Sequence, residues 1–356
     1  PTLVLGLPLL AAVLVYLLRR WALAAAAVAT IVAGGVAWMA WNWPPQATVF
    51  LLGRTVEMGE SVRLLGQELI LTPAARPLLT FTCGLAAVCF LYAWRISQGR
   101  SFFPFGLVLL SLFNGAALTQ PLTRAPLVLA FGAALAVYVI QAGRPGSTRG
   151  ALRWLIFPVL AFPFFLVAAW YLGQVHLNPD DLAPFAVAAR LLGYGFLFLL
   201  MAVPLHGAVP ALAADAPPLV SAFLLLSSNA VVIFLLNAFL RAYPWLADYR
   251  DVSRWLLWLG LLTAAWSGLL AAAQRDFGRL WGYASLHDFG CLLVALGLGG
   301  PVGLPLAVSI FITRAAVLLL GAMGLATLRH RARGDSFPRV SGTARRLPWS
   351  VAGLLA

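Results

Sequence analysis

The chain has 356 residues, of which 62% are hydrophobic and only 10% charged, and its formal net charge is +13. Soluble domains carry about 45–50% apolar and about 25% charged residues, so this composition excludes an ordinary soluble enzyme, a disordered chain and a disulfide-stapled secreted domain. The basic residues lie between long apolar runs, where the positive-inside rule places them in membrane proteins. We therefore expect a membrane protein and no nucleic-acid partner.

Apolar stretches of about 18 to 25 residues, the length that a bilayer requires, recur along the chain. They predict an all-α polytopic membrane protein with about 11 transmembrane helices and the start of a twelfth at Trp349. The stretches cover residues 1–18, 21–43, 78–96, 101–118, 125–142, 151–175, 182–204, 217–240, 255–274, 280–299 and 305–328. Because the chain begins with Pro1 and stops as the last run begins, we expect a fragment, truncated at its C-terminus.

All 24 basic residues are arginine. The connectors after the odd-numbered stretches hold 15 arginines and those after the even-numbered stretches hold 7. The odd connectors are therefore predicted to be cytoplasmic and the N-terminus extracytoplasmic. We expect the membrane to be the inner membrane of a bacterium.

The connector 44–77 differs from the others because two β-prone segments, Thr48 to Leu52 and Ser61 to Thr72, alternate with glycines. It predicts an extracytoplasmic hairpin. We accordingly divide the chain into residues 1–100, with three helices and the hairpin, and a core of residues 101–356.

Ionisable or polar side chains inside apolar runs are expensive and are usually kept for a pathway or a partner. The candidates for a proton path are His206, Asp215, Ser285, His287, Asp288 and Arg314. His206 and Asp215 fall in a proline-rich stretch that cannot form one unbroken helix, so we expect a discontinuous helix near residues 196–218. The alternative is a loop with a satisfied histidine and a helix-capping aspartate.

A second polar stretch runs from Gln274 to Cys291. Ser285 and Asp288 are three residues apart and share a helix face, with His287 beside them; an interfacial turn is the alternative. Arg314 lies in the middle of an apolar run and is expected to face the interior near His287 or Asp288.

The remaining polar residues of the apolar runs support no cofactor. Arg190 is expected to extend toward the interface or to pair with Asp180 or Asp181. The three cysteines, Cys83, Cys89 and Cys291, are interpreted as packing residues. The sequence contains no zinc signature, haem-type histidine spacing, phosphate-binding loop or nucleophile triad, so we expect no metal, cofactor, redox or hydrolytic site.

Both polar stretches resemble motifs of the antiporter-like membrane subunits of respiratory complex I, a family shared with Mrp antiporters and membrane-bound hydrogenases. The first resembles P-F-H-x-W-x-P-D-A/V followed by AP-x-P-V-S/T-A-F-L, through Pro204, His206, Pro210, Ala216, Pro217, Val220, Ser221, Ala222, Phe223 and Leu224. The second resembles Q-x-D-x-K-R-L-L-A-Y-S-S-I-x-H-x-G, through Gln274, Asp276, Arg279, Leu280, Tyr283, Ser285, His287 and Gly290. Arg314 occupies the position of a lysine in a third motif. The resemblance extends from about residue 120 to residue 356.

The resemblance implies a mid-membrane relay of one glutamate and several lysines. In this chain the relay positions hold Phe131, Leu199 and Asn229 instead. Independently of any alignment, no acidic residue occurs between Glu68 and Asp180. The usual relay is therefore predicted to be largely lost.

The resemblance implies a non-catalytic subunit of a complex I-type NADH:quinone oxidoreductase, with protons as the candidate ion. Its partners would be other membrane subunits and lipid, and quinone would be reached only through those subunits. The alternatives are a structural or assembly subunit without conduction, a subunit of an Mrp antiporter or membrane-bound hydrogenase, and a stand-alone secondary transporter.

Overall fold

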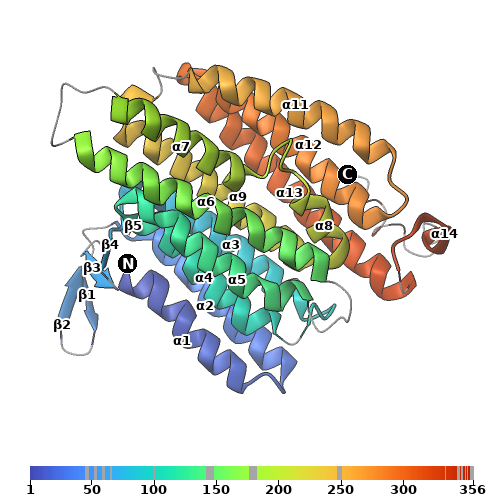
Figure 1. The fold of residues 1–356 in the computed structure, drawn as a ribbon. Helices are drawn as coiled ribbons and strands as arrows, with labels where there is room; N and C mark the ends of the chain where they lie inside the picture. The colour runs from blue at the N-terminus through green and yellow to red at the C-terminus, as the bar shows by residue number, and fades with distance from the viewer. Residues whose placement is uncertain are drawn as a thin grey trace.

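The computed structural model describes residues 1–44, 48–51, 54–57, 61–64, 66–99, 101–141, 148–175, 183–246, 251–332 and 334–342, with positions 345, 348, 350 and 352. Helices dominate these residues and lie side by side in one bundle (Figure 1). The helices are α1 (Thr2–Leu17), α2 (Ala22–Asn42), α3 (Arg76–Ala93), α4 (Phe102–Leu118), α5 (Ala125–Gln141), α6 (Thr148–Val175), α7 (Ala183–Leu200), α8 (Ala208–Asp215), α9 (Pro218–Ala242), α11 (Val252–Ala272), α12 (Phe277–Gly297), α13 (Gly300–Ala332) and α14 (Phe337–Val340).

Each of the predicted apolar stretches coincides with one long helix of this bundle. By length and composition, eight helical segments of the described chain can cross a membrane. They contain α2, α3, α5, α6, α7, α9, α11 and α13. The helices α1 and α4 are apolar but shorter, at 16 and 17 residues, and α12 carries His287 and Asp288 within it. The protein is therefore an all-helical membrane protein, and the predicted twelfth helix lies largely outside the described residues.

Helix α9 forms the centre of the bundle. It packs against α3, α4, α5, α7, α8 and α13. Phe223 of α9 contacts the rings of Phe90, Phe102 and Phe113 at centroid distances of 6.2–6.4 Å. All four phenylalanines are buried, so helices that come from both proposed parts of the chain share one apolar core.

Local sequence accounts for where several helices begin. Pro218 stands in the first turn of α9, where a proline costs no hydrogen bond. Asp251 and Asp276 cap α11 and α12, since their carboxylates accept the backbone N–H groups of Arg254 and Arg279.

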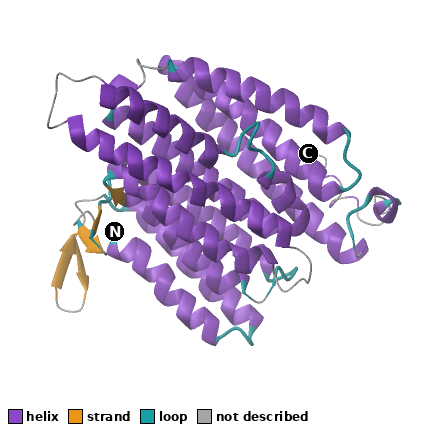
Figure 2. Cartoon of the chain, viewed as in Figure 1, coloured by secondary structure: helices purple, strands orange, loops and turns teal. Residues whose placement is uncertain are grey.

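The strands lie together at one end of the bundle, beside the N-terminus (Figure 2). β1 (Thr48–Leu51) pairs with β2 (Arg54–Glu57), and β3 (Val62–Leu64) pairs with β4 (Gln67–Leu69), both antiparallel. β4 also pairs with β5 (Thr119–Gln120), which follows α4. The single hairpin predicted for 44–77 is therefore two hairpins, and a strand from a distant connector extends the second one.

Helices α11 and α12 approach one another most closely through glycines. A Cβ atom added at Gly290 would lie 2.5 Å from the Ala264 nitrogen, and one added at Gly260 would lie 2.6 Å from the Val294 nitrogen. Small residues that bring backbones together are the usual means of packing helices in a bilayer. This contact fixes the orientation of α12, which carries most of the candidate site.

Candidate functional site: a broken helix and a buried arginine beside α12

The predicted break in the helix after residue 196 is present in the structure. Helix α7 ends at Leu200, Met201 takes a positive φ of 49°, and the chain turns before α8 starts at Ala208. A second interruption follows at Ala216 and Pro217, before α9. The interrupted backbone finds a partner outside its own segment, because the Val203 amide donates to the hydroxyl of Thr263 on α11 at 3.2 Å.

The C-terminal end of α8 is held by two side chains, those of Asp215 and Arg329. Asp215 accepts a hydrogen bond from the Gly150 amide near the start of α6 at 2.7 Å. Arg329, at the end of α13, donates to the carbonyls of Ala213, Ala214 and Ala216 at 2.8–3.2 Å. Asp215 therefore acts at helix ends, as the alternative interpretation expected, and it does not meet His206.

Arg329 is a residue of this site that the sequence pattern did not single out. It also pairs with Asp335, at 2.6 Å between Nη2 and Oδ2. A cation close to free carbonyls at a helix C-terminus complements the helix dipole. The only sequence signal was an arginine at the end of an apolar run with an aspartate six residues later, which many interfacial turns share.

His206 lies in the segment between α7 and α8 and is partly buried. Its Nδ1 is 3.3 Å from the carbonyl oxygen of Pro204, and its ring centroid is 6.3 Å from that of Tyr283 on α12. The adjoining helix α8 packs directly on α12, since a Cβ added at Gly282 of α12 would lie 2.8 Å from Pro210 Cα of α8. His206 thus contacts α12 at Tyr283. In the sequence, Tyr283 was noted only as a residue of the second motif.

Arg314 of α13 is 3% exposed and reaches α12. Its Nη2 donates to the carbonyl and the hydroxyl of Ser285 at 3.3 and 3.2 Å, and its guanidinium carbon lies 5.4 Å from the ring centroid of Phe289. Its Nε and Nη1 have no hydrogen-bond partner among the described residues. The prediction that Arg314 faces the interior is confirmed, although its contacts are with Ser285 and Phe289.

Asp288 follows Ser285 by one helical turn and is partly buried. It lies close enough to Arg314 for the two charges to attract, but the ion pairs among the described residues do not include this one within 4.0 Å. His287 is exposed and turns toward α11, where its Nδ1 is 2.9 Å from the Ala264 carbonyl oxygen. The structure therefore groups Ser285, Asp288 and Arg314, and it places His287 on a different side of α12.

The three positions that the resemblance assigns to the relay have different environments. Leu199 is 4% exposed and borders a cavity of about 20 Å³, together with Trp154 and Ser228. Asn229 is partly buried on α9. Phe131 is 61% exposed, on the outer face of α5. The inward residues of α5 include Leu129, Ala133 and Ala136, so the interior side of this helix carries no acid whichever residue occupies the relay position.

Among the described residues, the buried cysteines and Arg190 make no hydrogen bond or ion pair with Ser285, Asp288 or Arg314. Within the described ranges, no group of three or more histidine, cysteine or acidic side chains comes together as a metal site. Cys83 and Cys89 are buried in the core. Arg190 donates to the Ala186 carbonyl at 3.2 Å, and its predicted partners Asp180 and Asp181 lie outside the described residues.

These features are those of a polytopic membrane protein in which a broken helix and a buried cation both contact α12. The profile of the family described as NADH:quinone oxidoreductase/Mrp antiporter, TM, matches residues 171–348, which is half of the chain. The chain therefore belongs to this family of antiporter-like membrane subunits.

Its similar proteins include both branches of the family. NADH-quinone oxidoreductase subunit N of Rhodococcus opacus is 28% identical over 228 residues, which are 59% of this chain and 41% of that protein. A probable K⁺/H⁺ antiporter subunit of Rhizobium meliloti is 29% identical over 282 residues, 73% of this chain and 51% of that protein. The chain thus spans about half the length of these curated relatives.

Two solved structures share the fold. The archaeal membrane-bound sulfane sulfur reductase, a respiratory membrane complex, superposes with a TM-score of 0.79 at 19% identity, covering 99% of this chain and 76% of that chain. The Mrp complex of Dietzia sp. superposes with a TM-score of 0.76 at 23% identity, covering 92% and 37%. The antiporter-like fold therefore extends to the first helices, beyond the residues that the family profile matches.

Proposed function

We propose that the chain is an antiporter-like membrane subunit of a complex I-type NADH:quinone oxidoreductase in which the proton route through the first half of the bundle is lost. The observation that carries the proposal is the apolar interior of α5 and α7. Leu199 occupies the family's lysine position there, and the inward face of α5 is Leu129, Ala133 and Ala136.

A proton relay needs titratable groups or a continuous chain of water, and the described helices α5 and α7 include no acid, histidine or lysine. The cavity beside Leu199, about 20 Å³, is close to the minimum of about 10–15 Å³ that one water requires. One water there can satisfy the Trp154 Nε1, which has no other partner among the described residues, but it cannot form a wire. The buried Thr82–Asn114 hydrogen bond between α3 and α4 is polar but does not titrate near neutrality.

The later helices α12 and α13 keep polar groups, but the family's lysine is replaced there by the permanently charged Arg314. Arginine stays protonated at any accessible pH, so Arg314 can shape the local field and cannot pass a proton. Beside it, Asp288 carries a carboxyl group, which unlike a guanidinium can release and take up a proton. We therefore assign Arg314 an electrostatic and packing role between α12 and α13, in place of the family's lysine.

The placement in the membrane follows from the same proposal. The chain would cross the bilayer eleven times, with α1, α4 and α12 added to the eight long apolar segments, and residues 1–100 and 101–356 would form its two parts. The N-terminus and the strands would be extracytoplasmic. In spheroplasts, an impermeant maleimide should label Ser61→Cys, and it should label Ser97→Cys only after permeabilisation; the reverse pattern would invert the topology.

A second candidate is residual conduction through the α8–α12 interface. It is favoured by the contact of His206 with Tyr283, which lies one helical turn from His287. Proton flux into liposomes containing the purified chain separates the two. Under the main proposal, wild type, Tyr283→Phe and Arg314→Ala give the same flux as liposomes without protein, whereas a flux that Tyr283→Phe abolishes supports the second candidate.

Membership in a multi-subunit assembly is tested by mild-detergent purification from native membranes. Related proteins are named as subunits of a quinone oxidoreductase and of an antiporter, and the structural neighbours come from respiratory and Mrp complexes. We expect subunits with flavin or iron–sulfur centres, which would carry the redox chemistry, to co-purify. Co-purification with cation-antiporter subunits alone would favour the Mrp alternative, and recovery of the chain alone would contradict the proposal.

A further inference from the structure

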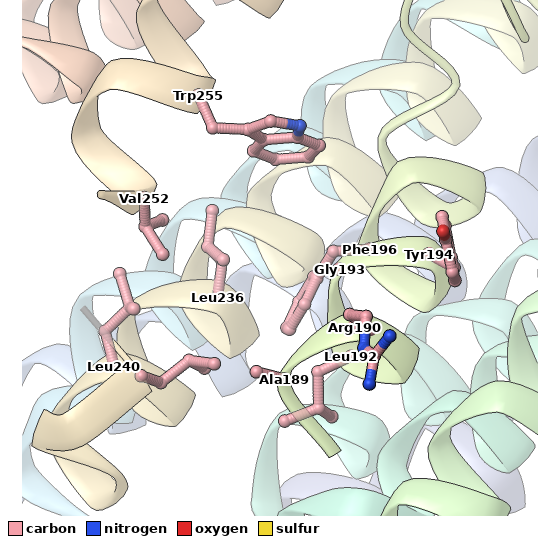
Figure 3. Close-up of a pocket in the computed structure, with 11 residues that line it drawn as sticks. Ala189, Arg190, Leu192, Gly193, Tyr194, Phe196, Leu236, Leu240, Val252 and Trp255 are labelled. Carbon is pink, nitrogen blue, oxygen red and sulfur yellow. The ribbon is translucent and has the colours of Figure 1, made fainter. Parts of the chain in front are cut away.

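A cavity of about 190 Å³ opens between α7, α9 and α11, at the end of the bundle where α7 and α11 begin and α9 ends (Figure 3). Its wall is largely apolar and aromatic. Figure 3 shows Trp255, Val252, Leu236 and Leu240 on one side, facing Phe196 of α7. None of the candidate residues of the proton path lines it.

We propose that this cavity, the α7–α9–α11 groove, binds one acyl chain of an anionic phospholipid whose phosphate lies on Arg190. A cavity of about 150 Å³ accepts a benzene ring, so 190 Å³ accommodates a segment of one chain, with the remainder in the bilayer. An apolar groove alone has no preference for a particular lipid, because leucine and lipid chains are equally apolar. Selectivity must come from the headgroup.

The charge at the rim supplies that selectivity. Arg190 lies about two turns inside α7, and its Nε donates to the Ala186 carbonyl one turn nearer the helix start. The guanidinium is thereby directed toward the membrane interface, as expected for an arginine that extends out of the hydrocarbon. Among the described residues, no hydrogen bond of its Nη1 or Nη2 is present, so these groups can donate to a phosphate, which arginine binds through two parallel hydrogen bonds.

Two further arginines stand at the ends of the helices that form the groove. Arg241 follows Leu240 and Arg254 precedes Trp255, and both arginines are exposed. Of the two acids in the connector between these arginines, Asp251 serves as the cap of α11 and Asp248 lies outside the described residues. Trp255 and the half-exposed Tyr194 are aromatic residues of the kind that favour the headgroup level. The arginines thus favour an anionic lipid over a zwitterionic one, and the aromatic residues place its headgroup at this level.

The test uses the purified full chain, incubated with phosphatidylglycerol or phosphatidylcholine in mixed micelles, with retained lipid counted by native mass spectrometry. An arginine near an anionic headgroup is worth about 1 kcal/mol, or roughly fivefold in affinity. Wild type should retain phosphatidylglycerol at least fivefold better than phosphatidylcholine. Arg190→Gln should reduce the phosphatidylglycerol affinity about fivefold, while Arg153→Gln, an exposed arginine on α6, should leave it unchanged.

A second variant tests the groove itself. A Cβ at Gly193 meets nothing within 4 Å, so Gly193→Leu should fill the groove without a clash and reduce retention of both lipids. Gly84→Leu, at an equally open glycine on α3, is its control. Equal retention of the two lipids by wild type, or unchanged retention in both Arg190→Gln and Gly193→Leu, would overturn the proposal. So would an assembly in which a partner's helix fills the groove.

Discussion

Replacing Arg314 by methionine should change the free energy of unfolding by no more than about 1 kcal/mol. A charge at the centre of a bilayer costs about 2.5–3.5 kcal/mol on insertion scales. In Arg314 this cost is offset by the hydrogen bonds of Nη2 to Ser285, about 1.5–3 kcal/mol for a charged donor, and by the Phe289 ring, about 0.5–2 kcal/mol. Methionine removes the cost of the buried charge together with the contacts to Ser285 and Phe289, and it keeps most of the side-chain volume.

The assay is reversible unfolding of purified wild type and Arg314→Met in mixed detergent micelles, with Ser285→Ala measured beside them. The expectation rests on the orphaned Nε and Nη1 and on the missing ion pair within 4.0 Å in the described part of the chain. Breaking a buried ion pair costs about 3–5 kcal/mol. A loss of that size in Arg314→Met would mean that a carboxylate neutralises the guanidinium, and the account of this site would be wrong.

Three further substitutions test how α8 and α12 are held, and a fourth, Gly84→Ala on α3, is a control. Gly290→Ala should destabilise the protein by about 1–3 kcal/mol, because its Cβ would lie 2.5 Å from the Ala264 nitrogen. Gly84→Ala, at an open helical position, should stabilise it by about 0.5–1 kcal/mol. Chemical denaturation measures the free energy of unfolding of both variants. Arg329→Met should cost about 3–5 kcal/mol, since Asp335 and three α8 carbonyls lose their partner, and hydrogen exchange should rise in α8 before the rest of the bundle. Asp215→Ala should cost about 0.5–2 kcal/mol in the same unfolding assay, as the loss of a helix cap does, and leave proton flux unchanged.

The long helices of the bundle could be predicted from the sequence because a membrane span is defined by length and apolarity alone. The break between α7 and α8 was equally predictable, since Pro204, Pro210 and Pro217 cannot share one helix. The burial of Arg314 followed from its place in the middle of an apolar run. Each of these features depends on neighbours in the sequence.

The features that could not be predicted depend on contacts between distant segments. The partner of Asp215 is Gly150, 65 residues away, and Arg329 reaches α8 across more than 110 residues. The rotation of α12, which turns His287 toward α11 while Ser285 meets Arg314, is set by glycine contacts with α11. A sequence motif gives the order of such residues along the chain, but it does not determine which neighbouring helix each side chain faces.

The strands show the same limit on a smaller scale. The β-prone composition of the connector after α2 indicated extended structure, but the pairing of β4 with β5 joins it to the end of α4.

The position of Phe131 is a related case. The resemblance assigned a relay position to Phe131, whereas the structure places this side chain on the outer face of α5, and the inward residues of that helix are apolar.

The most direct measurement is a structure of the assembled complex at a resolution that shows ordered water. The account predicts at most one water in the cavity bordered by Leu199 and Trp154, and no connection from it to Asp288. A continuous row of waters or titratable side chains from one membrane face to the other through this chain would contradict it.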